Sequence, residues 1–131
     1  MGDEIWDRFE AIEECYEFML AYAAQGLTND KGSESGGQVR EFLNRAVDAL
    51  RGLAESCASA GIMKNTFLAV LDRDAQDSLA AIELVLAQPT ISSQLIDNLN
   101  GSMHLRALLT DVFLMEEVLR AQRVASTLSV P

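Results

Sequence analysis

Apolar and polar residues alternate with the period of an α-helix along the first part of the chain. Apolar side chains recur there every three or four positions, at Ile5, Phe9, Ile12, Tyr16, Met19 and Ala23. Acidic side chains stand two positions before five of them, about 200° away on a helix, at Asp3, Asp7, Glu10, Glu14 and Glu17. The pattern predicts a helix from about Asp3 to Gln25, ended by Gly26, with a buried apolar stripe and an acidic face in water.

The next stretch, 26–37, carries no apolar pattern and is rich in Gly, Ser, Asn and Asp. These residue types favour loops, and the stretch is longer than the roughly two to eight residues that usually join the helices of a bundle. It is therefore predicted to be a flexible loop, which acts either as a mobile connector or as a functional lid.

A second amphipathic helix is predicted from about Gln38 to Gly61. Its apolar stripe comprises Val39, Phe42, Ala46, Leu50, Leu53 and Cys57. Gly52 lies inside this helix, where glycine costs about 1 kcal/mol relative to alanine, so we expect a neighbouring element to approach closely there. The outer face places opposite charges four residues apart, as solvent-exposed ion pairs do: Glu41 with Arg45, and Arg51 with Glu55.

A third helix is predicted to begin after Asn65 or Thr66, since either residue can cap its first amide groups. Its broad apolar face comprises Phe67, Leu71, Ala75, Leu79, Ile82 and Leu86. Pro89 prevents the helix from continuing.

The last helix, from Ser102 to about Ala125, is the most apolar segment of the chain. Its apolar residues are Leu105, Leu108, Leu109, Val112, Phe113, Leu114, Met115, Val118 and Leu119. They span more than about 200° of the helix, whereas a helix that contacts only its own core needs a stripe of about 100°. The helix is therefore either the most enclosed one or has a second, exposed apolar face, with Leu114, Val118 and the edge at Met115 pointing away from the core. Residues 126–131 are predicted to fray.

A short helix over Gln94–Leu99 is predicted between the third and last long helices, with Ser92 or Ser93 as its cap and a turn at 100–101 after it. Together these elements predict an all-α protein, an antiparallel four-helix bundle with one extra short helix between helices 3 and 4. The bundle forms a single domain over residues 1–131.

Charge narrows the range of partners. The chain has 20 acidic and 10 basic residues and a formal net charge of −10, which repels the phosphates of nucleic acids and anionic membrane surfaces. No secretory signal is recognisable, and the longest apolar stretches are well under the ~20 residues that cross a bilayer. We therefore expect a cytoplasmic protein with no nucleic-acid or membrane partner. Cys15 and Cys57 belong to no metal-binding or redox motif and should be free thiols.

Few residues are suited to catalysis. The chain has one histidine, His104, which excludes a two-histidine metal site and leaves a nucleophilic dyad only around this single residue. The sequence therefore predicts a protein that is not an enzyme and that uses no metal or cofactor.

Two groups of carboxylates are candidate site residues. The first is on the first helix and has no basic residue one turn further along, which makes it either a docking face for a basic partner or a solubilising face; it comprises Glu10, Glu13, Glu14 and Glu17. The second is Glu116, which falls within the apolar sector of the last helix, where a carboxylate needs a partner. It is either one half of an edge ion pair with Arg120, one turn on, or a buried functional acid.

One short segment is associated with a different function. Asp77-Ser78-Leu79 and the helix that continues to Leu86 resemble the Asp-Ser-Leu segment of acyl carrier proteins, which are small, acidic and helical. The resemblance implies that Ser78 carries a phosphopantetheine group. The Leu-Gly pair that usually precedes the motif is absent, and 67–77 is predicted to be helical where that family has a loop.

The wide apolar last helix, the acidic first helix and the scarcity of catalytic residues favour a non-catalytic protein–protein interaction module, such as an adaptor, a regulator or an assembly factor. The simplest contact is a homodimer through Leu114 and Val118 of the last helix. The first helix then remains available to another protein with a basic surface. The alternative is a carrier protein, either of an apolar small molecule in the bundle core or of an acyl group on Ser78.

Overall fold

Six helices make up the structure, a computed structural model that describes residues 2–59 and 66–128. They are α1 (Gly2–Ala23), α2 (Glu34–Leu50), α3 (Leu53–Ser59), α4 (Phe67–Leu86), α5 (Ser93–Asn100) and α6 (Met103–Leu128). The described residues contain no strand, which confirms the prediction of an all-α fold. α5 occupies the position of the predicted short helix.

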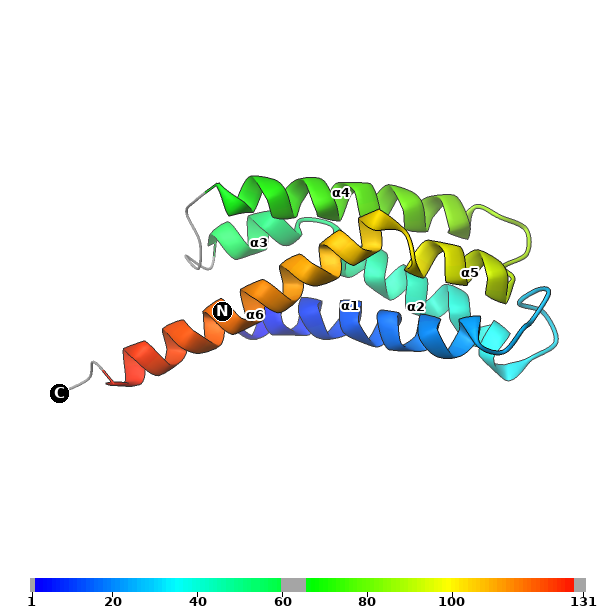
Figure 1. Ribbon diagram of the computed structural model, residues 1–131, viewed down its shortest axis with the longest axis horizontal. Helices are drawn as coiled ribbons and strands as arrows, with labels where there is room; N and C mark the ends of the chain where they lie inside the picture. Colours follow the sequence, from blue (N-terminus) through cyan, green and yellow to red (C-terminus); the bar gives the residue numbers. More distant parts are fainter. Residues whose placement is uncertain (1, 60–65, 129–131) are drawn as a thin grey trace.

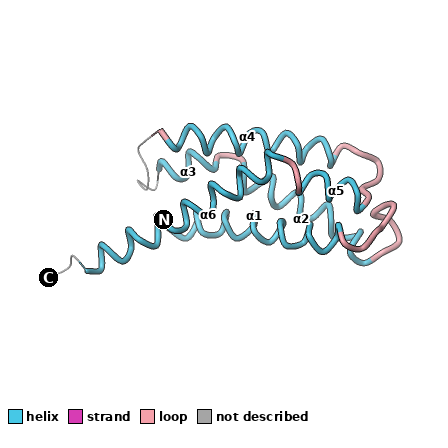
Figure 2. Tube along the Cα trace, in the orientation of Figure 1, coloured by secondary structure: helices cyan, strands magenta, loops and turns pink. Residues whose placement is uncertain are grey.

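The long helices lie side by side, except that the C-terminal part of α6 extends away from the others. α1 and α2 pack along each other, α4 packs against α2 and α3, and α5 packs against α1. α6 packs mainly against α4 and crosses the other helices diagonally, so that its C-terminal end extends past the N-terminal end of α1 (Figure 1). We refer to α1–α5 as the helical body. The loops 24–33 and 87–92 lie together at the opposite end of the molecule (Figure 2).

Buried apolar side chains from all six helices form one core. Those of α1 are Ile5, Phe9, Ile12, Cys15, Met19 and Tyr22. Cys15 and Tyr22 thus take the core positions that periodicity assigned to Tyr16 and Ala23, which are half-buried. The Tyr22 hydroxyl donates a hydrogen bond to the Ile91 carbonyl oxygen at 2.6 Å, so its phenol ring lies inside the protein with its polar group satisfied.

The second predicted helix is broken in two. α2 begins at Glu34, earlier than the predicted start at Gln38, because the Ser33 hydroxyl caps it by accepting a hydrogen bond from the Gly36 amide. Gly52, with a φ of 74°, separates α2 from α3, and residues other than glycine rarely adopt this conformation. The expectation of a close neighbour at Gly52 is wrong, since a Cβ built there meets no atom within 4 Å.

A guanidinium group from α1 stabilises this break. Arg8 donates hydrogen bonds to the carbonyl oxygens of Ala49 and Arg51, both at 2.8 Å. The last carbonyl groups of any helix lack hydrogen-bond donors within the helix. At the end of α2, the guanidinium group of Arg8 supplies these donors. The break therefore depends on a residue more than forty positions away in the sequence.

α6 is enclosed on one side and exposed on the other. Leu108 and Val112 are fully buried, whereas Leu114 and Val118 are exposed. Of the two alternatives predicted for this helix, the second therefore applies: α6 has an exposed apolar face in addition to its buried one. Met115 is 0 % exposed, so its expected place at the exposed edge is wrong: it lies on the core side, three residues after Val112.

Several predicted helix ends fall at the limits of the described residues. The end of a helix at Gly61 and the cap at Asn65 lie outside them. Thr66 precedes α4 but makes no capping hydrogen bond with its side chain. α6 continues to Leu128, beyond the predicted end, and the remainder of the segment predicted to fray lies outside the described residues.

Two further expectations concern the whole fold. Cys15 and Cys57 are both buried and free, as predicted. None of the described helices combines the length and the apolar character that spanning a membrane requires.

Candidate functional site

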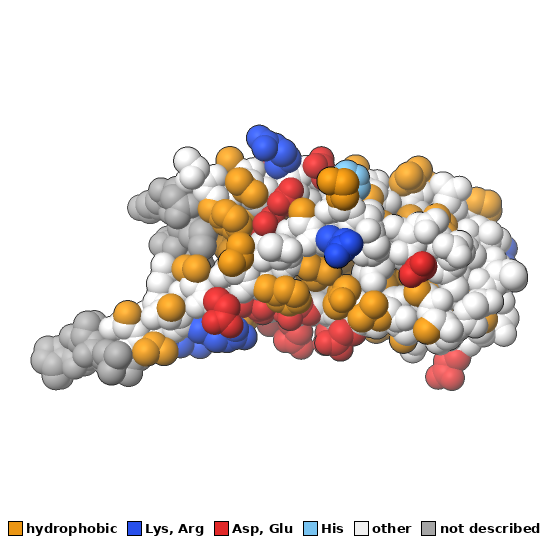
Figure 3. Space-filling view, viewed as in Figure 1, with side chains coloured by type: hydrophobic (Ala, Val, Ile, Leu, Met, Phe, Trp, Pro, Cys, Tyr) orange, Lys and Arg blue, Asp and Glu red, His pale blue; other side chains and the backbone are white. Residues whose placement is uncertain are grey.

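The outer face of α6 carries most of the large apolar side chains that are exposed in the described part of the chain. They are Met103, Phe113, Leu114, Val118 and Val124. Leu114 is 52 % exposed and Val118 is 37 % exposed, so the structure places both predicted contact residues at the surface. Figure 3 shows apolar side chains along this helix, beside a group of acidic and basic side chains near α1.

Part of this face forms a regular seam. Leu114, Val118, Ala121 and Ala125 follow one another at spacings of four, three and four residues, and all four are exposed. Such spacings are typical of a helix that pairs with another helix. The seam continues along the part of α6 that extends beyond the helical body (Figure 1), where a second helix can reach it.

The acidic face predicted for α1 is divided between three environments. Glu10 and Glu17 are exposed. Glu14 forms an ion pair with Arg45 of α2, in which Arg45 Nη2 lies 2.6 Å from Glu14 Oε1. Glu13 is half-buried and contacts α6. The partners of Glu13 and Glu14 lie on other helices, so they cannot be recognised from residues one turn away on α1.

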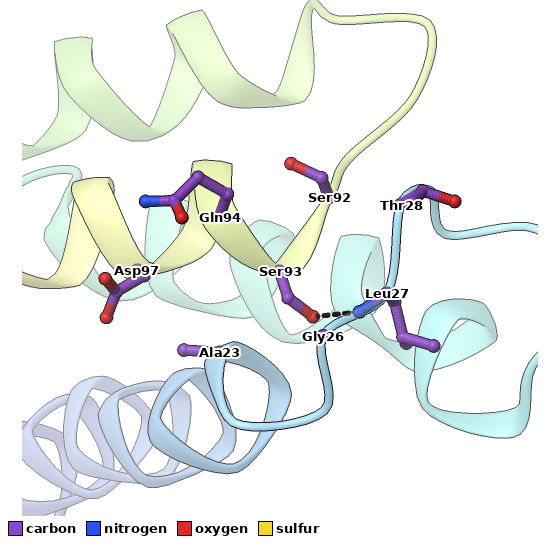
Figure 4. Close-up of a pocket in the computed structure, with 8 residues that line it drawn as sticks. All are labelled: Ala23, Gly26, Leu27, Thr28, Ser92, Ser93, Gln94 and Asp97. Atoms are coloured by element: carbon purple, nitrogen blue, oxygen red, sulfur yellow. Dashed lines mark hydrogen bonds between the residues drawn. The ribbon is translucent and has the colours of Figure 1, made fainter.

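A hollow of about 420 Å³ lies where α1 ends and α5 begins (Figure 4). The Ser93 hydroxyl on its wall accepts a hydrogen bond from the Leu27 amide at 2.9 Å and donates one to the Tyr22 carbonyl oxygen at 2.6 Å. These bonds connect the chain segments at this end of the molecule. The hydroxyl is thus engaged by backbone groups, and its role here is structural.

A second hollow, of about 310 Å³, lies where α1 meets α6, and four of its lining residues are glutamates of α1. Trp6 and Arg120 also line it. The guanidinium carbon of Arg120 lies 5.4 Å from the centre of the Trp6 ring, within the range of a cation–π interaction. Arg120 also forms an ion pair with Glu117 at 3.5 Å. The hollow is therefore acidic, and the arginine on its wall already has partners.

Glu116 closes this hollow from the α6 side. It is 8 % exposed and shares a hydrogen bond with Glu13. Burial, together with the hydrogen bond and the negative charge of Glu116, raises the pKa of Glu13 to about 7, although the charge of Arg120 opposes the rise. Of the two alternatives for Glu116, the ion pair with Arg120 does not form, and Arg120 pairs with Glu117. Glu116 is a buried acid instead, and its partner lies on another helix.

A second acid pair, which periodicity did not predict, joins α6 to α4. Asp111 is 5 % exposed and shares a hydrogen bond with Asp74 of α4. Burial first, and then the hydrogen bond and the negative charge of Asp74, together raise the pKa of Asp111 to about 7. The Oδ2 atom of Asp111 is buried without a hydrogen-bond donor among the described residues. The available signal was its position, three residues after Leu108 and four before Met115, both of which face the core.

Ser78 lies in the interior. It is 0 % exposed, and its hydroxyl donates a hydrogen bond to the His104 carbonyl oxygen at 2.9 Å. The His104 side chain itself is exposed at the start of α6. A phosphopantetheine group on Ser78 requires the hydroxyl to be accessible to a modifying enzyme, so this geometry weighs against the acyl-carrier alternative.

The core offers little room for a ligand. A cavity lined by apolar residues of α1, α2, α4 and α6 has a volume of about 10 Å³, close to the least that can hold one water molecule. An apolar small molecule would therefore have to displace core side chains of this cavity. This observation weighs against the second form of the carrier alternative.

Among residues 2–59 and 66–128, no group of three or more His, Cys, Asp or Glu side chains is placed to hold a metal ion. No protein family matches the chain, and neither a curated protein nor a solved structure shows significant similarity to it.

Proposed function

We propose that this protein is a non-catalytic interaction module that binds another protein through the outer face of α6. The observation that carries the proposal is the exposed seam of Leu114, Val118, Ala121 and Ala125. Contiguous apolar residues at a surface, bordered by charged residues, usually mark an interface. Glu117 and Arg120 are exposed next to the seam and supply such a border.

The helical arrangement supports this role. α1, the broken pair α2 and α3, α4 and α6 correspond to the four helices of an antiparallel bundle, with α5 as the extra short helix. A helix in such a bundle needs one apolar face for the core. α6 has a second apolar face, which the core does not use.

The simplest partner for the seam is a second copy of the chain. Two copies of α6 related by a two-fold axis bury the same residues on each side, so the contact needs no other surface. In this arrangement the exposed Glu10 and Glu17 of α1 remain available to a further protein with a basic surface.

Replacing both Leu114 and Val118 with glutamate tests the proposal. Like charges facing each other across the two-fold axis should convert a dimer into a folded monomer, as measured by light scattering with circular dichroism as the check on folding. Leu84→Glu is the matched control, because Leu84 is 67 % exposed on α4 and the same chemical change there should leave the dimer intact. If the unmodified protein is already monomeric at micromolar concentrations, the two-fold contact is wrong.

A further inference from the structure

α6 is joined to the helical body by two acid–acid contacts, one along each edge of its buried face. Glu116 meets Glu13 of α1, and Asp111 meets Asp74 of α4. Asp111 and Glu116 stand about 140° apart on the helix, given 3.6 residues per turn. Both are more than nine-tenths buried, at 5 % and 8 % exposed. The contacts therefore lie at the junction of α6 with two different helices.

Neither contact includes a basic partner within ion-pair distance among the described residues. The charged groups that line the hollow with Glu13 and Glu116 are Glu10, Glu14 and Glu17 of α1 and Arg120 of α6. Arg123 of α6 lies close by, with its guanidinium carbon 5.9 Å from the centre of the Trp6 ring. Glu14 is engaged by Arg45 of α2. Arg120 partly offsets the negative charge at Glu13 but pairs with Glu117 and stacks over Trp6.

The other contact is more isolated. Among the charged groups of the described residues, Asp74 is the one whose hydrogen bond and charge raise the pKa of Asp111. The buried Oδ2 atom of Asp111 has no donor among the described residues. A buried carboxylate without a donor or a cation is strongly disfavoured.

These contacts each require a proton. When one carboxyl group of a pair is protonated, its O–H donates a hydrogen bond to the other; when both are ionised, two negative charges repel each other in a medium of low dielectric constant. The pKa of Glu13 and that of Asp111 are each raised to about 7, which places the loss of these protons near neutral pH.

We propose that the two acid pairs form a proton-dependent latch, which holds α6 against the helical body and loosens it when the protons leave. The latch concerns the attachment of α6 and does not depend on the function of its outer face. Loosening exposes the other face of the helix, which carries Leu105, Leu108 and Val112 in the core. The surface that the protein presents therefore changes with pH.

The direction of the effect follows from proton linkage. In a detached α6 these carboxyl groups return to their ordinary pKa values of 4.5 for Glu13 and 3.8 for Asp111. Between about pH 4 and about pH 7 the attached state therefore binds more protons than the detached state. The equilibrium constant for opening α6 rises with pH across this range and levels off above it.

Hydrogen–deuterium exchange of the full chain from about pH 5 to about pH 8, corrected for the intrinsic rates, measures this opening. We expect the opening constant of α6 to rise at least roughly tenfold between about pH 5 and about pH 7, and that of α2 to rise less. The double variant Asp111→Asn, Glu116→Gln keeps the shapes of the side chains and should flatten the dependence. Asp72→Asn is the matched control, because Asp72 is exposed on α4, two residues before Asp74, and it should retain the dependence.

An opening constant of α6 that does not change with pH overturns the latch, as does an unchanged pH dependence in the double variant. Protection of α6 at about pH 8 by millimolar Mg²⁺ or Ca²⁺, lost in the double variant, also overturns it, since the acid pairs then hold a cation rather than a proton. If the double variant does not fold, Glu13→Gln and Asp74→Asn alter the other half of each pair and should flatten the dependence in the same way.

Discussion

The carboxylate of Asp30 and the guanidinium group of Arg40 connect chain segments that are distant in the sequence. Asp30 Oδ2 accepts a hydrogen bond from Arg40 Nε at 2.9 Å, and Asp30 Oδ1 accepts one from the Ile91 amide at 2.8 Å. Arg40 also donates to the carbonyl oxygens of Leu86 and Gln88 at the end of α4. The loop after α1, predicted to be flexible, thus contains a buried anchor point.

Asp30→Asn is expected to reduce the free energy of unfolding by about 1–3 kcal/mol, because it weakens charge-assisted hydrogen bonds at a buried position. Urea unfolding followed by circular dichroism measures the change. Lys31→Ala alters the exposed neighbouring residue and serves as the control, with little expected effect. Equal stability of Asp30→Asn and the unmodified protein would show that the anchor is dispensable.

Stability should pass through a maximum on the acidic side of neutral pH. Burial acts to raise the pKa of Asp30, but hydrogen bonds from the Ile91 amide and Arg40 outweigh it and hold this pKa below its ordinary value of 3.8. A lowered pKa contributes stability that is present above the ordinary value and is lost as the pH falls through the folded value.

The raised pKa values of Glu13 and Asp111 act in the opposite direction, since the stability that they provide is lost as the pH rises from about 4 to about 7. Urea unfolding at a series of pH values should show that the free energy of unfolding falls toward acidic pH and also falls toward neutral pH. Asp30→Asn should weaken only the fall toward acidic pH. A profile that rises steadily from acid to neutral pH would be inconsistent with the acid pairs.

Two adjacent glycines of α2 should respond oppositely to alanine. A Cβ at Gly36 would collide with the backbone carbonyl of Asp30, whereas a Cβ at Gly37 would meet no atom within 4 Å. Gly36→Ala should destabilise the protein by about 1–3 kcal/mol, because the loop must move. Gly37→Ala should stabilise it by up to about 1 kcal/mol through helix propensity. Thermal unfolding ranks the two variants, and the reverse order would contradict the close packing of α2 on this loop.

Both cysteines should be unreactive until the protein unfolds. Burial raises the pKa of the Cys15 thiol to about 12 and that of the Cys57 thiol to about 11, with Arg45 and Arg8, respectively, opposing the rise. The thiolate is the reactive form, so a chromogenic disulfide reagent should label both residues rapidly in urea, without prior reduction, and slowly in buffer. Rapid labelling in buffer would show that the core opens readily.

Periodicity predicted the helices because burial of one face repeats along the chain, but it could not predict which side chains meet across helices. Arg45 pairs with Glu14 rather than with Glu41, and Arg51 Nη2 lies 2.8 Å from Glu83 Oε2 rather than near Glu55. A partner four residues away is always near on a helix, but tertiary packing brings other carboxylates closer to both guanidinium groups.

In the candidate site too, exposure along one helix could be predicted from the sequence, whereas contacts between helices could not. The exposure of Leu114 and Val118 was predictable, since the apolar residues of α6 cover more of the helix than a core needs. The contacts of Glu116 with Glu13 and of Asp111 with Asp74 were not, because each joins two helices whose relative rotation depends on the packing of the entire core. The sequence could show only that a carboxylate was buried.

The hydrogen bond from the Ser78 hydroxyl to the His104 carbonyl oxygen attaches the first turn of α6 to α4. This contact is a point about which α6 can tilt. From His104 to its end the helix extends about 35 Å, at 1.5 Å per residue. Such a lever converts a small tilt near this contact into a large displacement at its free end: a rotation of about 10° moves the end by about 6 Å, given this length. A tilt of α6 about its contact with Ser78 would therefore move Ala121 and Ala125, at the far half of the seam, further than Leu114 and Val118, which lie nearer to the first turn.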